Sequence, residues 1–154
     1  MRIVRRKRIA KTAVLSVAAG AIIFDGPREK VFLTRRADNG RWCMPGGVME
    51  PGESAEEACV REALEETGLQ VRVTRLVGIY TNPDAVVEYE DGNRFQALDL
   101  AFEAEVIGGE PKLTEETTEY GYFSVESLDN LDVMEDNLEM IQDAVKRLAE
   151  AVVK

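Results

Sequence analysis

Histidine is absent from this sequence of 154 residues, and cysteine occurs only twice, at Cys43 and Cys59. The absence of histidine excludes histidine general bases, Ser-His-Asp triads and histidine-rich zinc sites. Two cysteines without metal-type spacing make no disulfide framework, and we expect both as free buried thiols. Any acid–base chemistry must therefore come from carboxylates, tyrosine, lysine or a bound metal ion.

Positive charge is also in short supply. The sequence has 19 Lys and Arg residues against 29 Asp and Glu residues, which gives a net charge of −10. A field of this sign repels nucleic acids and phosphates, so we disfavour a nucleic-acid partner and expect local cations around any anionic substrate. One basic cluster, in an N-terminal strand or tail over residues 1–12, could still contact RNA, anionic lipid or an acidic partner. It comprises Arg2, Arg5, Arg6, Lys7, Arg8 and Lys11.

Long apolar runs are missing as well, and none could span a bilayer, so we expect no membrane partner. The basic start and the apolar run 13–23 are similar to a secretory signal, but the turn at residues 25–27 and the strand after it favour a buried strand. We therefore predict a cytoplasmic protein. The length suits one domain over residues 1–154 with a core of its own.

Hydrophobic periodicity predicts the secondary structure. Strands are expected at 13–24, 30–36, 71–80, 95–107 and 120–124, helices at 55–67 and 135–152, and a polar loop at 81–92. The second helix carries a stripe of Leu138, Ile141, Val145, Leu148 and Val152, which is typical of a packing face. Strands mixed with two separated helices predict an α/β class in which the helices pack on a sheet.

The first helix follows a glycine-rich turn in the stretch GGVMEPGESAEEACVREALEETGL, residues 46–69. Ser54 and Glu57 form a capping box, and Gly68 is placed to end the helix. Three glutamates, Glu62, Glu65 and Glu66, share one face at positions i, i+3 and i+4. Their repulsion destabilises the helix unless a cation is present, and hard divalent cations prefer such oxygen ligands. The alternative is a plain solvated face.

The rest of this helix fits a binding face and a core face. On the helical wheel Ala55, Ala58 and Cys59 flank the carboxylates and leave room for ions and substrate. Val60 and Leu64 lie opposite and are expected to face the core. Arg61 can orient a carboxylate and offer charge near a phosphate. The preceding Pro45-Gly46-Gly47 turn allows close approach, so that a backbone carbonyl can add an oxygen ligand.

These residues resemble the box of the Nudix hydrolases, G-x5-E-x7-R-E-U-x-E-E-x-G-U, where U is aliphatic. All fixed positions are occupied, although Ala63 is small for its slot: Gly47, Glu53, Arg61, Glu62, Ala63, Glu65, Glu66, Gly68 and Leu69. The resemblance implies a Nudix-type α/β/α sandwich with a mixed β-sheet, a box helix and a C-terminal helix. It also implies Mg²⁺- or Mn²⁺-dependent hydrolysis, in which water attacks the pyrophosphate of a nucleoside diphosphate linked to another group X.

Residue roles follow from the resemblance position by position. The implied catalytic set is Glu53, Arg61, Glu62, Glu65 and Glu66. The implied metal ligands are Glu62, Glu65 and Glu66 with the carbonyl of Gly46, and Glu119 is a candidate further ligand. Because the general base in this family comes from the box or from a distant loop, Glu62, Glu66, Glu115, Glu116 and Glu119 all stay open for that role.

Substrate contacts are expected from Arg35, Arg36, Gly47 and Pro83. Pro83 lies 14 residues beyond Leu69, near the place where some ADP-ribose-hydrolysing members carry a proline. The substrate is therefore expected to be a small nucleotide: ADP-ribose, a nucleotide sugar or a nucleoside triphosphate. Two alternatives remain, a Nudix-fold module that binds a nucleotide without turnover and a hydrolase of RNA 5′ ends. The resemblance alone suggests a homodimer.

Overall fold

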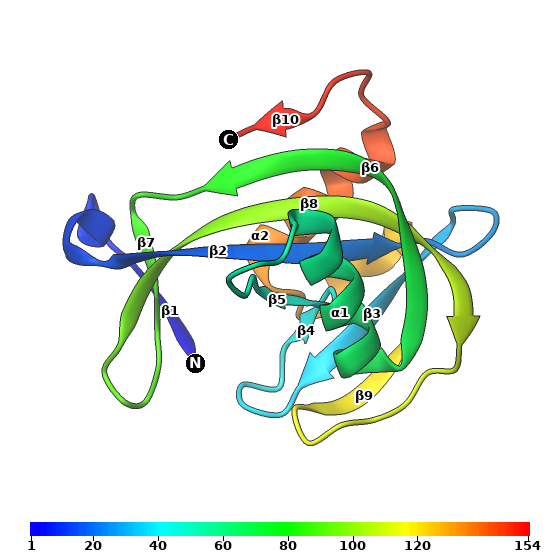
Figure 1. The fold of residues 1–154 in the computed structure, drawn as a ribbon, viewed down its shortest axis with the longest axis horizontal. Coiled ribbons are helices and arrows are strands. Elements are labelled where there is room, and N and C mark those ends of the chain that lie inside the picture. Colours follow the sequence, from blue (N-terminus) through cyan, green and yellow to red (C-terminus); the bar gives the residue numbers. More distant parts are fainter.

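The computed structural model describes residues 1–154 as two sheets with two α-helices (Figure 1). Its strands are β1 Arg2–Arg5, β2 Val14–Ile23, β3 Lys30–Arg36, β4 Trp42–Cys43, β5 Gly46–Val48, β6 Leu69–Thr81, β7 Ala85–Glu88, β8 Arg94–Gly109, β9 Thr117–Ser124 and β10 Val152–Val153. The helices are α1 Ala55–Thr67 and α2 Glu135–Lys146, with short 3₁₀ helices η1 Ile9–Thr12 and η2 Val125–Asn130.

The larger sheet is mixed, as predicted. Strand β2 pairs with β8 in parallel from Val14↔Phe95 to Ile23↔Ala104, and β5 pairs antiparallel with β2 on its other edge. Strand β8 also pairs antiparallel with β6 and, at its start, with β7. The smaller sheet has the order β4-β3-β9. The β2–β5 pairing places Gly46 and Gly47 in the middle of the molecule, next to α1.

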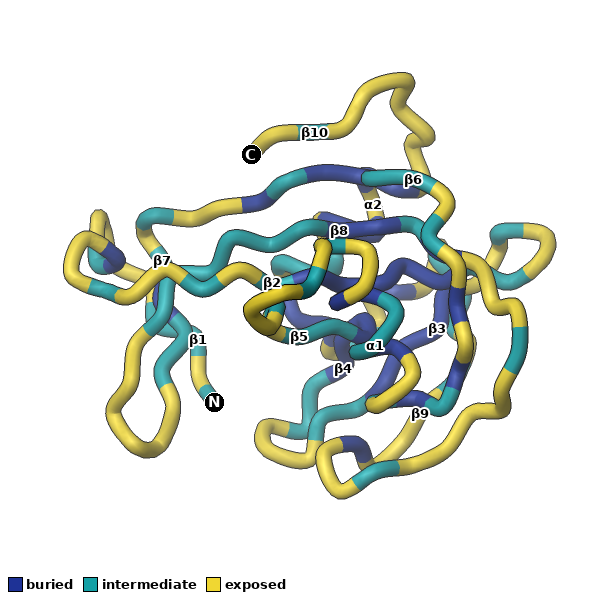
Figure 2. Tube along the Cα trace, in the orientation of Figure 1, coloured by how far each residue is buried: buried dark blue, intermediate teal, exposed yellow.

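The two helices cover opposite faces of the larger sheet. On the α1 face, Ala58, Cys59 and Ala63 join a core with Ala21 and Phe102 of the sheet. On the other face, α2 contributes Met140, Ile141 and Ala144 to a second core that also includes residues of the smaller sheet. Buried positions accordingly concentrate where the layers meet, and the outer loops are exposed (Figure 2).

The N-terminal segment forms part of the sheet. Strand β1 pairs antiparallel with β7 from Arg2↔Glu88 to Arg5↔Ala85, and β7 joins β8. This small extension, β1 with β7, lies at one end of the sheet in Figure 1. Strand β7 was not expected, because its four residues fall within the stretch 81–92 that the polar composition predicts as a loop.

The C-terminal helix is shorter than predicted. It ends at Lys146, and Arg147 follows in the left-handed conformation at φ 51°. The side chains of Arg28 and Arg75 donate to the last-turn carbonyl of Ala144, at 3.3 and 3.2 Å. Val152 then pairs with Gly78 of β6, so the end of the apolar stripe belongs to strand β10 instead of a helix.

The predicted strand over 13–24 is confirmed as β2, which runs through the centre of the sheet. The apolar run that is similar to a secretory signal is therefore part of the fold. None of the helices is long and apolar enough to cross a membrane. Both cysteines are free and buried, as expected.

Candidate active site

Helix α1 begins and ends at the predicted residues. The Ser54 hydroxyl accepts from the Glu57 amide, and the Glu57 carboxylate accepts from the Ser54 amide, which completes the capping box. Gly68 adopts the left-handed conformation at φ 78° and closes the last turn onto Leu64. These caps fix the rotation of the helix, and with it the direction of each glutamate.

The predicted core face of α1 is wrong in part. The buried residues are Ala58, Cys59, Ala63 and Thr67, whereas Leu64 is 43% exposed. Small side chains let the helix lie close to the sheet, and this brings the acidic residues next to them toward β5. The small residues expected to leave space for a ligand are instead the packing surface.

Gly46 and Gly47 allow this close approach. A Cβ atom at Gly46 would lie 2.8 Å from the Gly20 Cα atom of β2. This backbone atom cannot shift away, because β2 is paired with β5 and β8 in the sheet. A Cβ at Gly47 would lie 2.5 Å from the Glu62 carboxyl carbon. The Glu62 side chain therefore fills the space that a side chain at position 47 would take. At this contact β5 contributes backbone atoms and α1 contributes the Glu62 carboxylate.

Arg61 connects the acidic residues. Its guanidinium forms ion pairs with Glu53, with Glu62 at 2.8 Å and with Glu65 at 3.2 Å, and it also donates to the Val48 carbonyl at 3.1 Å. Because Arg61 donates to Glu53, the pKa of the Glu53 carboxyl is lowered. One arginine thus fixes the loop before the helix and two carboxylates on it.

Glu66 differs from its neighbours because it has no arginine partner. Its carboxylate is largely buried and accepts one hydrogen bond, from the Gly46 amide at 3.2 Å. Burial raises the pKa of Glu66 to about 8, with the nearby Glu62 and Glu116 adding to the effect. Burial also raises the pKa of Glu62, although Arg61 opposes this. The site therefore gathers four carboxyl groups around one ion-paired arginine, and the raised pKa keeps Glu66 mostly protonated at neutral pH unless a cation lies beside it.

The donor set fits a hard divalent cation. It consists of carboxylate and backbone oxygens only, as Mg²⁺ and Mn²⁺ prefer. No three acidic or cysteine side chains are already gathered around one point, since the Glu65 carboxylate is turned toward Arg61. The close packing of Gly47 on Glu62 and the buried, weakly partnered Glu66 nonetheless define a place where a cation would relieve unbalanced charge.

A cavity of about 410 Å³ opens beside this cluster. Glu66, Gly46 and Gly47 line one end of it, and Arg36 of β3 lies there too. The remaining walls come from β1, β2, β4, β7, β8 and the start of α2. Pockets of several hundred Å³ suit small organic ligands, so the acidic cluster borders a space large enough for a nucleotide-sized molecule.

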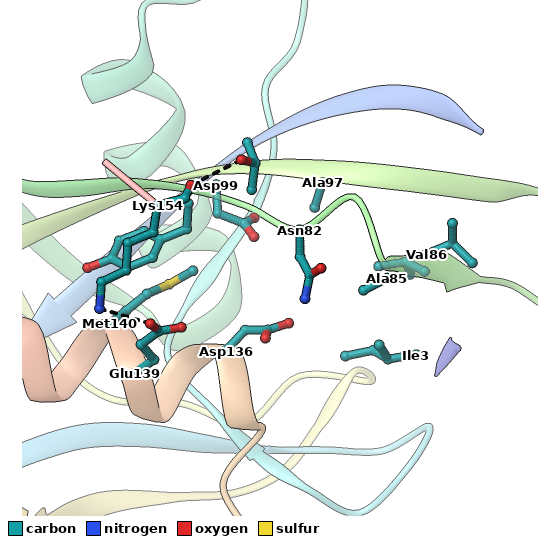
Figure 3. A pocket seen from close by; sticks show the side chains of 13 residues that line it. Ile3, Asn82, Ala85, Val86, Ala97, Asp99, Asp136, Glu139, Met140 and Lys154 are labelled. Atoms are coloured by element: carbon teal, nitrogen blue, oxygen red, sulfur yellow. Dashed lines mark hydrogen bonds and ion pairs between the residues drawn. The ribbon is translucent and has the colours of Figure 1, made fainter. Parts of the chain in front are cut away.

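The far wall of this cavity carries polar residues that the sequence did not reveal. Asp99 of β8 and Asp136 of α2 line it, and both also line a smaller adjoining cavity (Figure 3). Burial raises the pKa of Asp99 to about 6, and the charge of Asp136 adds to this. No local motif joins these two residues, and only the packing of α2 against β8 brings them together.

Several residues expected from the sequence lie elsewhere. Glu119 is exposed and pairs with Arg35 at 3.1 Å, while Arg35 also donates to the Gly40 carbonyl. Pro83 is in the turn before β7, where its carbonyl accepts from the Ala10 amide. Neither Arg35, Glu119 nor Pro83 lines the cavity beside α1. Glu116 is nearer, because its charge raises the pKa of both Glu62 and Glu66.

Arg36 is the cation that the structure does bring to the cavity. It lines the end near Glu66, and its guanidinium is bonded to Asp38 at 2.8 and 2.7 Å. Its position suits contact with an anionic group that lies beside the acidic cluster.

Comparison with known proteins places this geometry in context. A family model described as the NUDIX domain matches residues 14–144. An ADP-ribose pyrophosphatase of Methanocaldococcus jannaschii is 38% identical over 117 residues, which cover 72% of this chain and 66% of that protein. A putative 8-oxo-dGTP diphosphatase of Bacillus subtilis is 38% identical over 82 residues, covering 53% of this chain and 48% of that protein.

Solved structures agree on the fold. A NUDIX hydrolase from Nitrosomonas europaea superposes with a TM-score of 0.69 at 26% identity, over 86% of this chain and 89% of that one. The chain spans about half to two thirds of the length of the two curated relatives.

Proposed function

Because this chain belongs to the NUDIX family, whose members generally use a divalent metal ion, we propose that it hydrolyses a pyrophosphate bond in a nucleoside diphosphate linked to a second group. We take residues 1–154 as one catalytic domain. The names of the relatives support an ADP-ribose or nucleoside triphosphate type of substrate. The observation that carries the proposal is the partly buried Glu66, which accepts from the Gly46 amide and lines a cavity of nucleotide size.

The metal site proposed here uses Glu62, Glu65, Glu66 and the backbone of Gly46, with Mg²⁺ or Mn²⁺ as the ion. When bound, such an ion neutralises phosphate charge and lowers the pKa of water. Glu53 and Arg61 hold the carboxylates in place, because the Arg61 guanidinium already spans Glu53, Glu62 and Glu65. Arg36 is placed to contact the anionic part of the substrate.

The general base is proposed from the acids nearest the site. Glu62 and Glu66 lie in it, and Glu116 is close enough to affect the pKa of both. A bound cation would lower these raised pKa values, and a deprotonated carboxylate whose pKa lies near the operating pH accepts a proton from water efficiently. Because the chain has no histidine, we assign this role to a carboxylate and propose these three as the candidates.

The direct test is phosphate-coupled hydrolysis of a panel in Mg²⁺: ADP-ribose, nucleotide sugars, dinucleoside polyphosphates, nucleoside triphosphates and capped RNA. The Glu66→Gln protein serves as the blank. We expect the wild type to hydrolyse one class of these compounds and the Glu66→Gln variant to hydrolyse none of them. Equal release by both proteins, or none by either, would count against the enzyme.

A second measurement separates an enzyme from a nucleotide-binding module. Metal that binds only the folded state raises the melting temperature, by an amount that reflects about 1.4 kcal/mol when its concentration is ten times the dissociation constant. We expect Mg²⁺ at millimolar concentration to stabilise the wild type and to stabilise Glu66→Gln much less. Tight nucleotide binding without metal stabilisation or turnover would favour the binding module.

A further inference from the structure

We propose that the end of the cavity away from α1 receives a group with two adjacent N–H or O–H donors, bound side by side by Asp99 of β8 and Asp136 of α2. This inference rests on the function proposed above, because it assumes that the diphosphate lies at Glu66 and Arg36. It names the substrate class more closely: a nucleotide whose uncharged end, either a base edge or a sugar diol, presents paired donors.

Asp99 is the first observation. Its carboxyl group is largely buried, and the interactions that act on it are burial and the charge of Asp136, with no protein group donating a hydrogen bond to it. Because no side-chain oxygen of the protein is fully buried without a partner, the unpartnered Asp99 oxygens are accessible from the cavities that this residue lines. A ligand that displaces water from these oxygens must supply a donor in its place.

Asp136 is the second. One of its oxygens, Oδ1, accepts from Arg5 of β1 at 3.2 Å, which holds the side chain and leaves Oδ2 without a protein donor. Figure 3 shows Asp99 and Asp136 projecting into the same space, together with Asn82 from the loop after β6. The Asn82 carbonyl oxygen accepts from the Asp84 amide. Its amide nitrogen has no protein partner and remains available as a donor.

Charge determines which end of a nucleotide can enter. Lys154 lines the smaller cavity, but its ammonium group is paired with Glu139 at 2.9 Å and with Asp143 at 3.0 Å. Arg5 is already bonded to Asp136 and pairs with Glu135, and the N-terminal ammonium of Met1 pairs with Asp38 at 3.6 Å. Arg36 lies at the Glu66 end. A phosphate next to Asp99 and Asp136 would meet two carboxylates and no free cation, so the neutral end of the substrate belongs there.

The walls between these carboxylates and the acidic cluster are apolar. They are formed by Ile3, Val87, Phe95, Ala97 and Met140. Such walls suit the faces of a flat heterocycle, while the carboxylates define which edge it presents. An apolar cleft that ends in two carboxylate acceptors therefore favours ligands that present two hydrogen-bond donors over ligands that present one.

Two parts of a nucleotide supply adjacent donors. Guanine carries N1–H beside its 2-amino group, whereas adenine, uracil and cytosine offer one donor group on the corresponding edge. A ribose carries a vicinal diol, each hydroxyl of which is a donor. The test therefore uses pairs of compounds that differ by a single donor.

The first pair is GTP and ITP, which lacks the 2-amino group, and the second is ADP-ribose and its analogue lacking one hydroxyl of the terminal ribose. We expect wild type to prefer the complete member of one pair by about 10-fold or more in kcat/KM, as for a hydrogen bond to a charged group. In Asp99→Asn this preference should fall to within about threefold, through loss on the complete compound. The pair that responds identifies the source of the donors.

Asp129→Asn is the matched control, because it makes the same charge change on exposed η2 residue Asp129, away from both cavities. Circular dichroism verifies that each variant folds, and Asp136→Asn provides a second test of the same preference. Equal rates within both pairs for wild type, or a preference that Asp99→Asn leaves unchanged, would overturn the assignment.

If wild type hydrolyses none of the four compounds, the function proposed above is decided by the remaining members of its panel. Calorimetric binding of the same pairs then tests Asp99 without any need for turnover. A complete compound that binds no more tightly than its partner would overturn the inference in that case too.

Discussion

Acidic side chains reach the cavity from two sides, and the two groups are held differently. On one side, Arg61 of α1 binds Glu53 in the loop before the helix and Glu62 and Glu65 on it, next to Glu66, which lines the cavity and has no arginine partner. On the far wall, Asp99 has no donor, and Asp136 has only the exposed Arg5. The arginine keeps the first group ordered as anions that can bind a cation. The second group lacks such support, which suits it to neutral donors that a ligand brings.

The largest expected effect comes from removing the charge of Glu66. We expect Glu66→Gln to lower kcat by about 1,000-fold or more, because it takes a ligand charge from the proposed metal site. Glu65→Gln should cost less, about 100-fold, since the Glu65 side chain is 60% exposed and is shared with Arg61. Steady-state kinetics at saturating Mg²⁺ measures both, and near-normal rates would show the ligand assignment to be wrong.

Changing the arginine tests what orders the α1 group. Arg61→Lys keeps the charge but cannot span three carboxylates and the Val48 carbonyl, so we expect kcat to fall by about 10- to 100-fold. The control is Arg72→Lys on the exposed pair of Arg72 with Glu105, which should stay within about twofold. Similar losses in both variants would indicate a general effect on stability and leave no special role for Arg61.

The contrast between the two groups also explains what the sequence could predict. The α1 acids could be predicted because helical spacing, the capping box and the glycine turn are all local features of the sequence. The predicted helix bounds 55–67 and the mixed sheet are confirmed. The face of α1 was harder to predict. Leu64 looked like a core residue by its type, but the small residues Ala58 and Ala63 permit closer packing and are buried instead.

The second group could not be predicted, because Asp99 and Asp136 are 37 positions apart and meet only through tertiary packing. The same holds for the short strands β7 and β10, which exist because a neighbouring strand edge is available to each. The end of α2 depends likewise on Arg28 and Arg75, which donate to its last turn from distant strands and loops.

The burial of Asp99 has a consequence for stability. Its pKa is about 6 in the folded protein against an ordinary value of 3.8, so the folded state holds the proton more tightly than the unfolded state. The resulting stabilisation is complete below about pH 4 and is lost as pH rises to about 6. Across this range we expect the free energy of unfolding of the wild type to fall by about 1–2 kcal/mol relative to that of Asp99→Asn, after allowing for solvent screening.

Urea unfolding of both proteins between pH 4 and 8 measures this difference directly. Groups that titrate equally in both proteins cancel when the two free energies of unfolding are subtracted at each pH. Asp129→Asn makes the same substitution at an exposed side chain away from both cavities and is measured in parallel as the control. A flat difference curve for Asp99→Asn would mean that the Asp99 carboxyl group is fully hydrated in the folded state.

The smallest expected effect separates two acids that the sequence treats alike, Glu116 and Glu119. Glu119 is exposed and binds Arg35 away from the cavity, so we expect Glu119→Gln to change kcat/KM by less than about twofold. Glu116→Gln should have the larger effect, because its charge acts on Glu62 and Glu66. Parallel kinetics of the two variants is a sensitive test, since both make the same substitution within four residues of each other. A greater loss at Glu119 would mean that this segment rearranges when substrate binds and brings Glu119 to the α1 acids.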